Sequence, residues 1–210
     1  MRVLLFPTLS TSILVTALFV GMGCPSLYGQ KINGISFVGG PQEVSMNQID
    51  PLVDIETNYI TLMPFAYGSS GNSKLNYQNL DWQYWGESLK GVRATAEMAN
   101  ERGIDCMIKP QIWFDRGSFT GDFELNSEQE WKEFESDYTS YILSFAKLSQ
   151  ELDLPVFCIG TELCKFAEQR PGYWFELISQ VKTVYSGQLT YASNWDSYNK
   201  MEFWQELDYI

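Results

Sequence analysis

Polar and aromatic side chains lie at the ends of three of the apolar segments in this sequence or directly after them. The residues are Lys109, Gln111 and Trp113 at the end of one segment, Glu162 after the next, and Asn194 and Trp195 after the third. A carboxyl group can transfer protons, amide and ammonium groups can bond to hydroxyl groups, and indole rings can stack on the apolar faces of sugar rings. The set therefore predicts a carbohydrate site, with Glu162 as its catalytic residue and the other five as substrate ligands. For Lys109, an ion pair with a neighbouring carboxylate is the alternative.

The position of Glu162 carries most of this prediction. It follows the apolar run 156–160 after only Thr161, and the active sites of parallel α/β barrels lie at the C-terminal ends of the strands. We expect Glu162 at the mouth of such a fold, where it would serve as a general acid/base. An ordinary rim glutamate, or a charge at a helix N-terminus, is the alternative.

The composition limits the chemistry further. The 210 residues include no histidine, which excludes Ser-His-Asp and Cys-His catalysis and most zinc sites. We expect neither a metal nor a cofactor. The formal net charge of -12 argues against nucleic acid and against an anionic membrane surface, because both bind basic patches. A neutral polysaccharide or oligosaccharide is compatible with this charge.

Short apolar runs alternate with longer amphipathic ones, which is the pattern of a parallel α/β sheet. We predict strands over 32–38, 59–65, 105–113, 155–160 and 189–193, and the start of a sixth over 207–210. We predict helices over 45–57, 87–102 and 172–185, and Gly103 ends the second of these. We also predict one helix behind a Ser-x-x-Glu capping box at 127–130 and a short one over 201–205. Pro51 lies inside the first helix and predicts a bend or a break there.

The spacing of these units predicts a (β/α)8 TIM barrel. Five units occupy residues 31–206, so each takes about 35 residues and eight would need about 280, near the usual size of such a barrel. We therefore expect residues 30–210 to form the N-terminal five to six βα units of one barrel domain that is incomplete at the C-terminus. We expect the full-length protein to be a monomer.

The first residues are typical of a signal peptide. Arg2 precedes an apolar stretch over 13–20, which is too short and too early for a membrane span. Two cleavage sites compete: cleavage before Cys24 would produce a lipoprotein anchored through that residue, and cleavage after Gly29, which we favour, would remove residues 1–29. We expect an exported protein, secreted or periplasmic, with no transmembrane segment in the mature chain.

Several segments resemble those of a known enzyme family. The segment around Glu162 resembles the acid/base segment of clan A glycoside hydrolases, which usually carry Asn where this chain has Thr161. More specifically, the chain over 31–210 resembles glycoside hydrolase family 113, which contains β-mannanases. The matching segments are Ile35-Ser36-Phe37, Trp85-Gly86, Lys109-Pro110-Gln111-Ile112-Trp113, Gly160-Thr161-Glu162-Leu163 and Ser193-Asn194-Trp195.

The resemblance implies a retaining glycosidase that cleaves a β-linked polysaccharide, β-mannan first and glucan second. It implies that Glu162 is the acid/base and that a second glutamate, at the end of a seventh strand, is the nucleophile. That strand is not among those predicted here, and Asp115, Asp122 and Asp196 do not match the nucleophile position. Two other hypotheses stay open: a non-catalytic carbohydrate-binding barrel, and an exported structural or assembly protein that binds no sugar.

Overall fold

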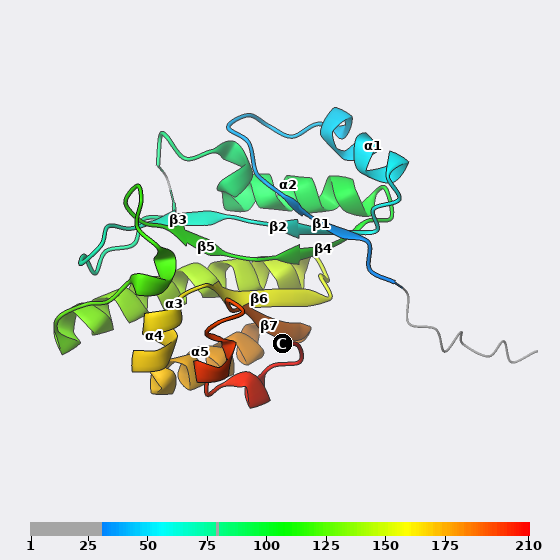
Figure 1. Cartoon of the computed structure of the whole chain (residues 1–210). Helices are drawn as coiled ribbons and strands as arrows, with labels where there is room; N and C mark the ends of the chain where they lie inside the picture. Colours follow the sequence, from blue (N-terminus) through cyan, green and yellow to red (C-terminus); the bar gives the residue numbers. More distant parts are fainter. Residues whose placement is uncertain (1–30, 79) are drawn as a thin grey trace, which may run out of the picture. The chain divides into compact units, whose positions relative to one another are not determined.

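Five parallel strands form the main sheet of the computed structural model, which describes residues 31–78 and 80–210. In chain order they are β1 (Gly34–Phe37), β2 (Tyr59–Leu62), β4 (Asp105–Ile108), β6 (Val156–Thr161) and β7 (Gln188–Ala192). They keep this order in the sheet, and every neighbouring pair is parallel (Figure 1). A doubly wound sheet reverses its strand order at a switch point, whereas this sheet adds each strand to the same edge, as a barrel does.

Helices follow the strands and pack against one another in chain order. The α-helices are α1 (Met46–Asp54), α2 (Leu89–Asn100), α3 (Glu128–Glu151), α4 (Cys164–Gln169) and α5 (Pro171–Val184). The 3₁₀ helices are η1 (Trp85–Glu87), η2 (Thr120–Asp122), η3 (Tyr198–Lys200) and η4 (Trp204–Glu206). Because α1 contacts α2, α2 contacts α3 and α3 contacts α5, the longer helices form one layer beside the sheet.

Capping residues set the ends of the long helices, and the one predicted at 127–130 is among them. Ser127 Oγ accepts a hydrogen bond from the backbone N of Glu130 (3.3 Å), and the Glu130 carboxylate accepts one from Ser127 Oγ (2.9 Å), which satisfies a free N–H at the start of α3. Ser88 caps α2 in the same way, through the backbone N of Gly91 (3.0 Å). Gly103, with φ of +71°, follows α2 in the left-handed conformation that the sequence predicts there.

Two of the predicted strands are each divided into two. The strand predicted over 59–65 is β2 followed by β3 (Phe65–Tyr67), and the strand predicted over 105–113 is β4 followed by β5 (Gln111–Trp113). β3 and β5 pair with each other in a second, two-stranded parallel sheet. The continuous strands of the prediction are therefore wrong at these two points.

A proline lies at each division, and a proline has no N–H for the strand ladder. The residues are Pro64 and Pro110. The two segments nevertheless stay side by side, because Lys109 N donates to Leu62 O (2.8 Å) and Gln111 N donates to Pro64 O (2.9 Å). β3 and β5 therefore still extend the neighbouring strands β2 and β4 to one rim.

Other differences concern short segments. Residues 207–210 are not a strand, because the Asp208 carboxylate accepts the N–H of Leu189 (2.8 Å) and the N–H groups of Asp208 and Tyr209 share the Leu189 carbonyl. The helix predicted over 201–205 is the 3₁₀ helix η4, and α4 was not predicted. Pro51 does not break α1, which continues through it.

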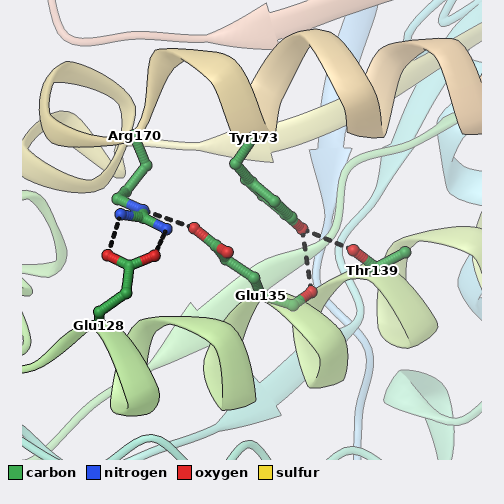
Figure 2. A network of polar contacts seen from close by, with 5 residues as sticks. All are labelled: Glu128, Glu135, Thr139, Arg170 and Tyr173. Atoms are coloured by element: carbon green, nitrogen blue, oxygen red, sulfur yellow. Dashed lines mark hydrogen bonds and ion pairs between the residues drawn. The ribbon is translucent and has the colours of Figure 1, made fainter.

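An ionic network joins α3 to the segment between α4 and α5 (Figure 2). The Arg170 guanidinium donates two hydrogen bonds to Glu128 (2.8 and 2.9 Å) and one to Glu135 (2.6 Å), and these bonds raise the pKa of Arg170. Beside it, the Tyr173 hydroxyl bonds to Thr139 (2.9 Å) and to the backbone carbonyl of Glu135. The network therefore fixes the chain that follows β6 onto α3.

The predicted signal peptide, residues 1–29, lies outside the described residues. None of the helices in residues 31–78 and 80–210 has the length and apolar character that crossing a membrane requires.

Candidate active site

Glu162 lies one residue beyond the end of β6, in an unusual backbone conformation. Its φ is +57°, in the left-handed region that residues other than glycine rarely adopt. The register between β6 and β7 also shifts between Cys158 and Thr161, as it does at bulges that redirect a side chain. A conformation of this kind costs about 1–3 kcal/mol and persists only where the surrounding structure holds it.

Hydrogen bonds on both sides hold this strand end between its neighbours. The backbone N of Glu162 donates to Ala192 O (2.8 Å), the last residue of β7. Thr161 Oγ1 donates to Pro110 O (3.2 Å), directly before β5. Glu162 therefore lies between β5 and β7, and the other predicted site residues lie in or next to these two strands.

Buried hydroxyl groups support the same strand end from the helix side. Tyr191 is 2% exposed, and its hydroxyl accepts a hydrogen bond from the backbone N of Leu163 (2.9 Å), the residue after Glu162. The Tyr138 hydroxyl donates to Ile159 O (3.0 Å). Gly160 has no room for a side chain, because a Cβ there would lie 2.7 Å from the Tyr138 hydroxyl and 2.9 Å from the Trp174 ring.

The Glu162 side chain itself is partly buried and makes no hydrogen bond or ion pair with the residues that the structure describes. The backbone N–H groups of Glu162 and Leu163 are hydrogen-bonded, whereas the Glu162 carboxyl group has no bonding partner among the described residues. This arrangement suits proton transfer, which requires a group held in place but not neutralised by a neighbour.

Three of the predicted ligands lie on one face of the chain along β5, because side chains alternate along a strand. They are Lys109, two residues before β5, and Gln111 and Trp113 within it. Their neighbours on the other face are buried, whereas Trp113 is 56% exposed and the other two are partly exposed. Lys109 forms no ion pair with the described residues. Burial raises the pKa of the Cys158 thiol, and the nearby charge of Lys109 acts in the opposite direction.

The third group of predicted site residues follows β7. Asn194 is partly buried, and its backbone carbonyl accepts hydrogen bonds from the N–H groups of Ser197 (3.1 Å) and Tyr198 (3.0 Å). This turn presents Trp195, which is 88% exposed. An indole that is held on a fixed turn but open to solvent can meet a flat apolar ligand face.

Sequence patterns did not indicate one further polar pair, Tyr67 and Glu87, which lies near the rim. Tyr67, at the end of β3, donates a hydrogen bond to the carboxyl group of Glu87, which is 6% exposed. Burial raises the pKa of Glu87, and the bond from Tyr67 acts in the opposite direction. Burial and the bond to Glu87 raise the pKa of Tyr67. The pair comes from segments 20 residues apart, and only the folded chain brings them together.

The described residues contain no group of three or more His, Cys, Asp or Glu side chains that could hold a metal ion. Of the acids not assigned a role, Asp115 accepts a hydrogen bond from the backbone N of Ser70 (2.8 Å).

Comparisons with known proteins agree with the fold. The family model described as Glycoside Hydrolase Family 113 matches residues 40–210. Among solved structures, the family 113 β-mannanase of Alicyclobacillus acidocaldarius in complex with ManMIm is 22% identical, with a TM-score of 0.74 over 84% of this chain and 59% of that chain. A family 113 β-1,4-mannanase in a complex (21%, TM-score 0.71) and a further structure of such an enzyme (20%, TM-score 0.70) each match 84% of this chain and 60% of theirs. The chain thus spans about three fifths of the length of these structures, and no curated protein matches it.

Proposed function

This chain belongs to glycoside hydrolase family 113, and we propose that in the full-length protein it cleaves a β-linked polysaccharide, with β-mannan as the first candidate and glucan as the second. The observation that carries the proposal is the strand end at Glu162. A glutamate is held there in left-handed backbone between two neighbouring strands, and no described residue engages its carboxyl group.

The proposed mechanism is a retaining double displacement. Glu162 donates a proton to the glycosidic oxygen while a second carboxylate attacks the anomeric carbon, and it then takes a proton from the water that releases the glycosyl-enzyme. The two carboxyl groups of such enzymes lie about 5 Å apart. We propose that the nucleophile comes from a seventh barrel strand, which is not among the five main strands described above.

The proposed substrate ligands are the exposed and partly exposed groups on the same rim. Trp113 and Trp195 would stack on sugar rings, and Gln111, Asn194 and Lys109 would bond to hydroxyl groups. The matching solved structures are those of β-mannanases, which supports mannan over glucan as the substrate of this chain. The same aromatic groups also favour the second candidate, a carbohydrate-binding barrel without catalysis.

Replacement of the exposed indole tests the proposed substrate class. In the full-length protein, Trp195→Ala should weaken the binding of manno-oligosaccharides about twofold to tenfold, because we expect a sugar ring stacked on an indole to contribute on the order of 0.5–1.5 kcal/mol, as an aromatic pair does. Calorimetric titration with manno- and gluco-oligosaccharides measures it, and Trp113→Ala should behave similarly. Because Trp195 is 88% exposed, the melting temperature should not change. Unchanged affinity in both variants would contradict a glycan cleft on this rim.

We further propose that Tyr191 positions Glu162. Tyr191→Phe leaves the N–H of Leu163 without its partner, which costs about 1–3 kcal/mol and loosens the turn that holds Glu162. We expect kcat to fall about tenfold with KM nearly unchanged, because small displacements of a catalytic group slow the reaction.

A second buried tyrosine provides the control for this variant. Tyr185 is 3% exposed, and its hydroxyl donates to Leu154 O (2.6 Å) at the opposite end of β6. Tyr185→Phe should lower the free energy of unfolding to a similar extent but leave kcat unchanged. If both variants lose kcat equally, Tyr191 acts on stability alone.

Export is proposed on the composition of residues 1–29, with the free secreted form favoured over a lipoprotein anchored through Cys24. We propose a monomeric full-length protein.

A further inference from the structure

A hollow of about 340 Å³ lies at the edge of the proposed site, between β3, β5 and the loop that follows β3, and Trp113 is the predicted ligand that lines it. Its walls include Tyr67, Asn72, Asn76, Trp82 and Trp113. Trp82 is 59% exposed and Trp113 is 56% exposed, so both indole rings are open to a ligand. The sequence patterns did not single out Trp82, because it lies in an irregular segment rather than at a strand end.

The aromatic wall of this hollow is held rigidly. The rings of Tyr67 and Trp82 meet edge to face, with centroids 4.5 Å apart, and the Tyr67 hydroxyl is tied to the buried Glu87. Gln83, next to Trp82, donates through Nε2 to the carbonyls of Tyr77 (3.2 Å) and Phe65 (3.4 Å). Groups that are already held in place bind a ligand with less loss of conformational entropy.

The polar lining of the hollow suits a neutral ligand. Lys74 and Asp115 supply one positive and one negative side chain, so no net charge selects an ion. Asn72 Oδ1 already accepts the backbone N–H of Lys74 (2.9 Å), whereas the side-chain amide of Asn76 has no partner among residues 31–78 and 80–210. Aromatic faces with a few amide groups, in a volume near the lower limit of about 300 Å³ for ligand pockets, match a single sugar unit.

We propose that this hollow is a sugar-binding subsite that takes one hexose unit of the polysaccharide, with Trp82 and Trp113 against its ring faces. The inference rests on the proposed function and extends its substrate site. Thr161 bonds to Pro110 O, which puts the next residue, Glu162, near the level of Gln111. Trp113 lies two residues beyond Gln111, so the hollow begins about 7 Å along the strand from the level of Glu162. A short oligosaccharide bound at Glu162 would not reach the hollow, whereas a long one would.

Binding as a function of ligand length tests this subsite. The full-length protein carrying Glu162→Gln, which binds without cleavage, is titrated with manno-oligosaccharides from the disaccharide to the hexasaccharide. Trp82→Ala in this background should leave the affinity for the disaccharide unchanged and weaken that for the hexasaccharide about threefold to tenfold. Trp82→Phe, which keeps an aromatic ring, should restore most of the loss.

Tyr84→Ala is the matched control, because Tyr84 is a 48% exposed aromatic residue on the same segment that does not line the hollow. It should not change the affinity for any length. If Trp82→Ala has no effect, or weakens all lengths equally, the subsite is refuted. A protein without Glu162→Gln that neither binds nor cleaves any β-linked oligosaccharide would refute the proposed function instead, so the two failures are distinguishable.

Discussion

Glu162→Gln in the full-length protein should slow the hydrolysis of a β-linked polysaccharide about 10²–10⁴-fold, the usual effect of losing one general acid/base. Glutamine keeps the size of the side chain but cannot give up and regain the proton. Because the Glu162 carboxyl makes no bond to a described residue, the substitution should leave the melting temperature unchanged. Release of reducing ends from β-mannan measures the rate.

The loss should depend on the leaving group. An aryl glycoside with an acidic phenol needs little protonation to depart, so its first step should survive and the glycosyl-enzyme should accumulate without a base for water. Azide needs no base and should restore turnover, giving a glycosyl azide of retained configuration. Product release from an activated aryl glycoside, with and without azide, measures both effects.

The control for this variant is Glu168→Gln on α4. Glu168 is exposed and pairs with Lys200 (3.2 Å), and its substitution should leave every rate unchanged. If Glu162→Gln keeps the original activity on polysaccharide, the assignment is wrong. If all substrates lose activity equally and azide has no effect, Glu162 has another role.

Trp174→Ala should lower the free energy of unfolding by about 3–5 kcal/mol, the usual loss when a buried tryptophan is truncated. Trp174 lies on α5 with none of its side chain exposed, and its ring lies 5.1 Å from that of Phe203 and 5.2 Å from those of Phe166 and Tyr191. Its removal would leave a cavity directly behind the strand end that carries Glu162. Denaturant unfolding of the full-length protein measures the loss.

Two variants define the cause of this loss. Phe175→Ala removes a 41% exposed ring from the next position of the same helix and should cost less than about 1 kcal/mol. Trp174→Phe should cost less than half as much as Trp174→Ala, because the buried Nε1 of Trp174 has no partner among the described residues and no hydrogen bond is lost. Equal losses for Trp174→Ala and Phe175→Ala would show that burial at this position contributes nothing special.

The family and most of the secondary structure could be predicted from local patterns. The resemblance to family 113, drawn from short segments at strand ends, is confirmed by the match over 40–210. The apolar runs give β1, β2, β4, β6 and β7, and Ser127 and Gly103 mark helix ends, because periodicity and capping act over a few neighbouring residues. The roles of the site residues stay predictions.

Local patterns did not predict that two of the strands are divided. Pro64 and Pro110 are visible in the sequence, but whether a proline ends a strand or only interrupts it depends on the neighbouring chain. Here the hydrogen bonds from Lys109 and Gln111 keep the two segments side by side. The six-residue helix α4 and the conformation of 207–210 depend likewise on contacts with distant residues.

By itself, the sequence determined that the protein is a parallel α/β chain and that a glutamate follows the end of its fourth main strand. Only the tertiary structure decided how that glutamate is held. The left-handed backbone of Glu162 exists because Ala192, on another strand, accepts its N–H and Tyr191 accepts that of the next residue. The hollow at Trp82 likewise depends on the bond between Tyr67 and Glu87. Residue types and their spacing determine which groups are available, whereas a strained backbone or an aromatic pocket is stabilised by partners that are distant in the chain.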